Sequence, residues 1–262
     1  MKQALLVVAV LAPFSGAVAQ ETPEPIRLPE ELAIARSIVM QDADELETTA
    51  SFQFFKLPDQ KQITAEAEFE YGLADRWELD AGVPYEFVDP NGGRSTDGIG
   101  DVEAAVRYGV IPRGKQAFTF DLGLEAGIPT GDRTHDLGEG RLTLEPFFTA
   151  STWLGRVNVE FNGGWQWAVT NAGEEPHNAF EYNVAVLYPI NRWFLVLEGD
   201  GESNRDSTTY YLTPELIWKP AKNLQFLVAV PIGVTHASAD YGVVASVTLE
   251  LENITHRGAD KD

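Results

Sequence analysis

The stretch "ITAEAEFEYGLADRWELDAGVPYEF", residues 63–87, alternates apolar and acidic side chains for most of its length. One parity holds Ile63, Ala65, Ala67, Phe69 and Tyr71, and after "GLADR" it holds Trp77, Leu79, Ala81, Val83 and Tyr85. The other parity holds Glu66, Glu68, Glu70, Glu78, Asp80 and Glu86. Because successive residues of a β-strand face opposite sides, the pattern predicts two strands with one uncharged face and one face rich in carboxylates.

The same period recurs along the chain. We expect about twelve strands, at residues 46–57, 62–72, 76–87, 100–111, 117–128, 141–153, 156–168, 178–188, 193–200, 208–219, 224–233 and 240–251. Each is about as long as a tilted strand that crosses a bilayer. Tight turns alternate with longer polar loops, which is typical of outer-membrane barrels of Gram-negative bacteria. Residues 45–251 are therefore predicted to form an all-β, transmembrane antiparallel up-and-down β-barrel, and residues 252–262 a periplasmic tail.

The N-terminus differs from the rest of the chain. Lys2, the apolar run "ALLVVAVLAPF" and the small residues "AVA" at 17–19 have the layout of a cleaved signal peptide, predicted over residues 1–19. A retained N-terminal anchor is the alternative. Residues 20–44 are rich in proline and acids, and we expect either a periplasmic lead-in or a partial plug, with plain disorder as the alternative.

Composition narrows the possible partners. The 262 residues include 40 acidic and 19 basic side chains, for a formal charge of −21, and no cysteine. Nucleic acid is excluded as a partner because a phosphate-binding surface must be basic. Without cysteine the chain has no disulfide and no thiolate metal site. We expect the partners to be outer-membrane lipid, the barrel-assembly and periplasmic chaperone machinery, and a small-molecule solute.

A water-soluble β-sandwich would also show alternation. The predicted strands are longer than those usual in sandwiches, and the apolar parity carries almost no charge. Four tryptophans sit beside tight turns and are expected to anchor the barrel at one membrane interface: Trp77, Trp153, Trp193 and Trp218. These features favour a barrel in lipid.

The inward parity carries the candidate functional residues. Those expected to contact solute are Glu68, Glu70, Glu78, Asp80, Glu103, Arg107, Glu125 and Glu160. If "LAD" closes the second hairpin, Glu70 faces Glu78 and Glu68 faces Asp80. Acidic rings favour cations, so a cation-favouring lumen is one hypothesis. The other is a solvated interior without selectivity, with salt bridges to loop arginines such as Arg133 or Arg141.

No enzymatic or cofactor motif stands out. His236 and Ser238 have the spacing of the pair used by some outer-membrane lipid hydrolases, but they fall in a loop and no orienting acid or amide is identifiable. The remaining histidines have no metal-ligand spacing, and no phosphate-binding loop or dinucleotide fingerprint is present. We expect no catalytic residue, no metal and no cofactor.

Three stretches carry a family resemblance: "GLADRWELDAGVPY" at residues 72–85, "GIGDVEAAVRYGV" at 98–110 and "LEAGIPTGD" at 124–132. They resemble, in the same order, recurrent pieces of the outer-membrane barrel family associated with meta-pathway phenol degradation. The resemblance implies a channel-like barrel for passive uptake of small solutes, including aromatic or hydrophobic compounds. Two other classes stay open, a lipid-modifying hydrolase and a structural or adhesive barrel that transports nothing.

Overall fold

The structure is a computed structural model that describes residues 26–113, 118–135, 137–138, 140–169 and 178–255. The predicted signal peptide, the first residues of the lead-in and most of the predicted tail lie outside these ranges. No helix among the described residues is long and apolar enough to cross a membrane.

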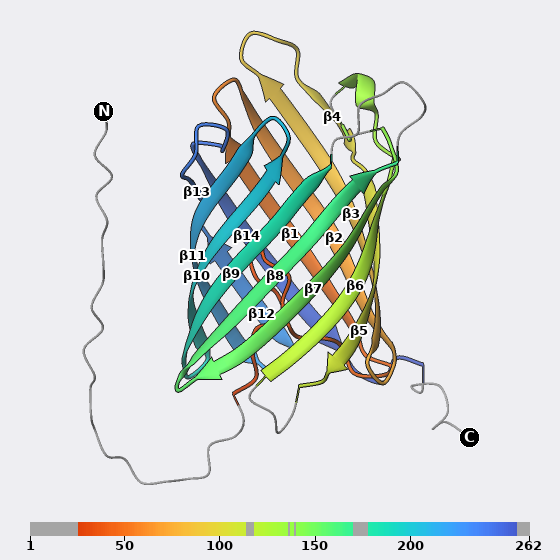
Figure 1. Ribbon diagram of the computed structural model, residues 1–262, viewed down its shortest axis with the longest axis vertical. Helices are drawn as coiled ribbons and strands as arrows, with labels where there is room; N and C mark the ends of the chain where they lie inside the picture. Colours follow the sequence, from red (N-terminus) through yellow and green to blue (C-terminus); the bar gives the residue numbers. More distant parts are fainter. Residues whose placement is uncertain (1–25, 114–117, 136, 139, 170–177, 256–262) are drawn as a thin grey trace, which may run out of the picture.

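The fold is a closed antiparallel β-barrel (Figure 1). Its strands are β1 (Leu46–Lys56), β2 (Gln60–Ala74), β3 (Trp77–Pro90), β4 (Thr96–Ile99), β5 (Val102–Ile111), β6 (Phe118–Ile128), β7 (Thr143–Leu154), β8 (Val157–Ala168), β9 (Ala179–Ile190), β10 (Trp193–Asn204), β11 (Thr208–Ala221), β12 (Leu224–Ala229), β13 (Ile232–Gly233) and β14 (Tyr241–Leu251), with one 3-10 turn, η1 (Arg133–His135). The strand positions follow the order of the chain around the wall, and β1 pairs with β14 to close it.

The wall has twelve strand positions, as the alternation predicted. Strands β4 and β5 follow one another along β3, and β12 and β13 follow one another between β11 and β14. Each of these two pairs therefore fills a single position. Closure matters physically because hydrocarbon offers no hydrogen bonds to an open sheet edge.

The outward face is apolar, as the lipid interpretation requires. Large side chains such as Phe52, Leu122 and Leu195 are 46%, 47% and 49% exposed although they lie mid-strand. The residues between them on the same strands face inward and are mostly buried. This distribution fits a wall whose outer surface contacts hydrocarbon.

One predicted pairing is wrong by two residues. In the second hairpin Glu70 lies opposite Asp80, and Gly72 lies opposite Glu78. The chain turns at Asp75 and Arg76, and the register shifts between Gly72 and Ala74. Arg76 adopts a positive φ of 70°, which lets a two-residue turn replace the expected three-residue loop.

The coil before β1 lies inside the barrel. We call residues 26–44 the luminal segment; Figure 1 shows it as a red to orange trace between the walls. It begins near the tight turn before β12, where Arg27 contacts the carbonyl of Lys222, and it returns to the tight-turn end where Asp44 N–H donates to the Gly72 carbonyl. It is therefore a loop that enters and leaves the lumen at the same end.

Candidate functional site

The lumen holds its inserted segment largely through carboxylates. The luminal segment has no helix or strand, so its backbone N–H groups need acceptors from elsewhere. The Glu198 carboxylate accepts three hydrogen bonds from them. Its Oε1 accepts from Ala33 N–H at 3.0 Å, and its Oε2 accepts from Ile34 and Ala35 N–H at 3.2 and 3.1 Å. Hydrogen bonds to an ionised acceptor are about twice as strong as neutral ones.

Other inward acceptors continue this pattern along the segment. Glu215 Oε2 accepts from Ala33 N–H at 3.1 Å, and Glu160 Oε2 accepts from Ile38 N–H at 3.0 Å. Glu78 accepts from the Gln41 N–H, and the Gln225 side chain from the Glu30 N–H. The alternating acids of the sequence thus have a structural task that the sequence alone did not show.

Cationic side chains add further contacts between wall and segment, three of them on or against strands other than β1 and β14. Arg107 lies inward, as predicted, at 3.0 Å from Glu78 and 3.1 Å from Asp121, and it donates to the Ser37 carbonyl at 2.8 Å. Lys219, which the sequence analysis missed, donates to the Leu28 carbonyl at 2.8 Å. The alternation could have revealed that Lys219 faces inward, because it has the same parity as Thr213, Glu215 and Ile217 on β11.

The third cation comes from the segment itself. Arg36 lies 2.9 Å from Glu125 and 3.2 Å from Glu145, and its guanidinium stacks 4.3 Å from the centre of the Phe147 ring. One of the two hypotheses for the lumen acids included salt bridges to loop arginines such as Arg133 or Arg141. In the structure the partner of Glu125 and Glu145 comes from the lead-in instead.

Apolar packing covers the other side of the segment. Its residues Leu28, Leu32, Ala35, Ile38 and Val39 share one buried cluster with inward residues of β9–β12 and β14, namely Ala185, Leu187, Phe194, Val196, Ile217, Leu227, Ala229 and Val244. At these positions the strands are apolar on both faces, unlike β2 and β3. The inner apolar patch and the segment therefore remove each other from water.

The eight predicted solute contacts divide into two groups. Glu70, Glu78, Arg107 and Glu160 are 8%, 0%, 3% and 1% exposed. In this arrangement these four cannot reach a solute. The less buried candidates are Glu68, Asp80, Glu103 and Glu125, of which Glu103 is the most open.

The lumen leaves a small space beside the segment. A small pocket next to the turn of the segment is lined by Ile34, Arg36, Glu145, Phe147, Asn162, Gly163, Gly164, Glu181, Tyr182 and Asn183. The β8 backbone approaches closely there: a side chain at Gly164 would meet Glu145 Oε1 at 2.1 Å. The lumen is therefore filled at the tight-turn end, and some inward residues beyond the segment, such as Glu103, are less buried.

One carboxyl of the segment has a strongly shifted pKa. Burial raises the pKa of Glu31 well above its usual value of 4.5, and neighbouring carboxylates add to the effect. The charged groups facing it are Glu68, Glu47, Asp80, Glu70 and Arg107. The docked form therefore holds a proton that the undocked form releases, so docking weakens as pH rises from about 4.5 towards the raised value.

Three of the four predicted interface tryptophans face outward. Trp77, Trp193 and Trp218 are 43%, 41% and 39% exposed, and Trp193 stacks on Trp218 at 5.5 Å between ring centres. Trp153 does not: it packs against the buried cluster inside the barrel. The expectation that it anchors the barrel in lipid is wrong, because Trp153 shares the parity of the buried Thr149 and Ser151.

The serine of the hydrolase alternative has a structural role. Ser238 is buried, accepts from the Tyr210 N–H at 2.9 Å and donates to the Tyr210 carbonyl at 3.0 Å. Its hydroxyl also lies 2.7 Å from that of Thr235, and within the described part of the chain no hydrogen bond joins it to His236. An activated serine would need such a base.

Residues 68–251 match the family model described as "Putative MetA-pathway of phenol degradation". The chain belongs to this family. The match covers most of the barrel, including all three stretches that carried the resemblance. No curated protein matches the chain.

Solved structures support the same fold. The NanC porin superposes with a TM-score of 0.53 at 10% identity, covering 79% of this chain and 99% of that one. The KdgM porin gives 0.54 at 10% identity, with 77% and 98% covered, and the β domain of the Bordetella autotransporter BrkA gives 0.53 at 10%, with 79% and 99% covered. The closed wall with its apolar outer face is that of an outer-membrane barrel, and these likenesses show the same fold.

Proposed function

We propose that this family member is an outer-membrane channel for small solutes, with an acidic vestibule open to the long-loop side and a periplasmic end closed by the luminal segment. The proposal rests on a difference between the two ends of the lumen. Carboxylates at the tight-turn end bind the segment, whereas Glu103 on the long-loop side is exposed and Glu145 and Glu181 line a small pocket beside the segment.

The vestibule favours cations over anions. Arg36 lines the pocket beside it and is already held by Glu125 and Glu145. Glu66, Glu86, Glu103 and Glu181 share the inward parity around it. Rings of Asp and Glu side chains raise the local concentration of positive ions and repel anions. A KdgM porin structure, with a TM-score of 0.52 to this chain, holds an oligogalacturonate, and the acidic wall here would disfavour such an anion.

An uncharged aromatic or hydrophobic compound is the second class of solute that we propose. The family description, which refers to phenol degradation, supports it. Passage of either class requires the luminal segment to move aside, because its apolar residues fill the space between β9, β12 and β14. Carboxylate-bound N–H groups can exchange their acceptors for water when the segment leaves, so the closed state is reversible in principle.

Planar bilayers and liposomes test the proposal. The reconstituted protein should conduct in steps, give a reversal potential of cation-selective sign in a KCl gradient, and let liposomes swell in small neutral solutes. Variants that loosen the segment, such as Glu198→Gln, should swell faster than wild type. A barrel that neither conducts nor swells in either form would be a structural barrel. Ester hydrolysis lost in Ser238→Ala would instead favour the lipid hydrolase.

A further inference from the structure

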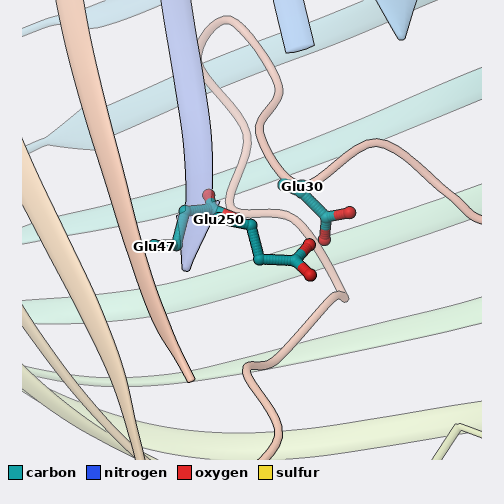
Figure 2. A group of neighbouring side chains, drawn as sticks. All are labelled: Glu30, Glu47 and Glu250. Carbon is teal, nitrogen blue, oxygen red and sulfur yellow. The ribbon is translucent and has the colours of Figure 1, made fainter. Parts of the chain in front are cut away.

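The barrel closes where its first and last strands meet, and an acidic cluster lies at this seam. Glu47 of β1 stands opposite Glu250 of β14, and Glu30 of the luminal segment lies against both. Figure 2 shows Glu30 on the coil, with Glu47 and Glu250 on the two adjacent strands. One carboxylate oxygen of each residue lies within 4.8 Å of the others.

These carboxylates are withdrawn from water. Glu30, Glu47 and Glu250 are 3%, 1% and 2% exposed. Like charges directly opposite one another destabilise a strand pair, and burial strengthens their repulsion. Such a group is stable only if positive charge or protons compensate it.

A second observation points to a ligand. Each carboxylate uses one oxygen on a protein partner: Glu30 Oε1 on Lys219 at 2.6 Å, Glu250 Oε2 on Arg27 at 2.6 Å and Glu47 Oε2 on Gln41 at 3.1 Å. The other oxygens, Glu30 Oε2, Glu47 Oε1 and Glu250 Oε1, are buried and have no hydrogen-bond partner among the described residues. Native proteins rarely leave such atoms without a donor, an ordered water or an ion.

The carboxylates at the seam outnumber the cations beside them. Glu45 adds a fourth carboxylate, 3.9 Å from Arg27. Glu252, which is exposed, adds a fifth carboxylate within 4.8 Å of Glu45 and Glu250. The carboxylates therefore outnumber the two cations beside them, Arg27 and Lys219.

We propose that Glu30, Glu47 and Glu250 bind a calcium ion that joins the luminal segment to both strands of the seam. All available ligand atoms are oxygens, which hard cations prefer. Calcium accepts irregular coordination with few waters, whereas magnesium keeps most of its water shell in a strict octahedron, so the dry, irregular cluster suits calcium better. The site is independent of the proposed transport function, since a barrel that transports nothing would also be stabilised by it.

The first test is direct binding to the full chain in detergent. The wild-type protein, stripped with EDTA and dialysed against ⁴⁵Ca²⁺, should retain about one ion per chain with a Kd at or below about 1 mM, the weakest range of natural calcium sites. Mg²⁺ at equal concentration should displace little of it. Wild-type protein that binds no calcium in this range overturns the proposal whatever the variants do.

The second test compares the unfolding temperatures of wild type and a variant, first in EDTA and then in calcium. In EDTA, Glu47→Gln should unfold at a temperature equal to or above that of wild type, because the substitution removes repulsion. In calcium the order should invert, since the variant binds calcium at least about tenfold more weakly and gains little. Glu250→Gln repeats the test if Glu47→Gln does not fold.

The matched control is Glu202→Gln, the same charge change at an exposed inward position of β10 away from the seam. It should bind calcium and respond to it as wild type does. Equal calcium responses in Glu47→Gln and Glu202→Gln would show that any bound calcium lies elsewhere.

Discussion

Replacing Glu198 by glutamine tests whether lumen carboxylates hold the luminal segment in place. Glu198 accepts three backbone hydrogen bonds from Ala33, Ile34 and Ala35. Glutamine keeps the size of the side chain but offers one acceptor oxygen instead of two and turns an NH₂ group towards the remaining donors. The variant therefore perturbs the hydrogen bonds with little change in packing.

The expected loss follows from these bonds. Hydrogen bonds to a charged acceptor contribute roughly 1.5–3 kcal/mol each, and neutral ones about 1 kcal/mol. Losing one bond and converting the others to neutral ones costs about 4 kcal/mol in docking free energy, from which relief of repulsion with Glu215 subtracts about 1 kcal/mol. A net loss of about 3 kcal/mol raises the undocked population about 150-fold.

Cysteine labelling measures this population. The chain has no cysteine, so Ala35→Cys, a small substitution at a position 5% exposed, introduces a single thiol that reacts with maleimide only when the segment undocks. The labelling rate in the Glu198→Gln background should exceed that in the Glu198 background by about the factor above. Glu202→Gln, on the same strand and the same side, is the matched control and should leave the rate unchanged.

Glu215→Gln separates hydrogen bonding from charge relief. It removes one of the two charges of the pair but keeps all three Glu198 bonds, so its rate should rise much less. If Glu198→Gln labels no faster than Glu202→Gln, the carboxylates do not hold the segment and the account of the lumen given above is wrong.

Three other perturbations have defined outcomes. Glu103→Gln should shift the bilayer reversal potential towards zero without changing the melting temperature, because the side chain is exposed; an unchanged potential would place the selectivity elsewhere. Raising the pH from 5 to 8 should speed labelling of the Ala35→Cys thiol, normalised to a loop thiol, since the pKa of Glu31 is raised in the docked state; Glu31→Gln should abolish this dependence, and a pH response that persists in it would contradict the assignment. Gly72→Ala should displace the end of the segment and lower stability by about 1–3 kcal/mol, measured by thermal unfolding, because its side chain would lie 1.9 Å from the Asp42 carbonyl oxygen; a neutral effect would mean that the segment is not fixed there.

The strand pattern could be predicted almost completely because two solvents act on it. Lipid excludes charge from one face and the lumen accepts it on the other, so an alternation of side chains marks nearly every strand. The wrong predictions concern residues for which the alternation was not used or carries no information. Trp153 was assigned to lipid from its nearness to a turn, although its parity is that of Glu145.

Two other features needed long-range information. The pairing of Glu70 with Asp80 depends on a bulge beside Gly72, which alternation alone does not reveal. The interior contacts of residues 26–44 had a weak signal in strands such as β10, where Phe194 and Val196 make the inward face apolar as well. A strand that is apolar on both sides in a barrel indicates an occupant within, but it does not identify which part of the chain supplies it.

The reach of the luminal segment constrains the order in which the protein is built. Its contacts join Ile38 to Glu160, Ala33 to Glu198 and Arg27 to Glu250, across 122, 165 and 223 residues of chain. The segment can therefore complete its contacts only after β14 is in place, because Glu250 belongs to that strand. We therefore expect docking of the luminal segment to be the last step of folding. In a barrel that lacks β14, a protease should be able to cleave the luminal segment.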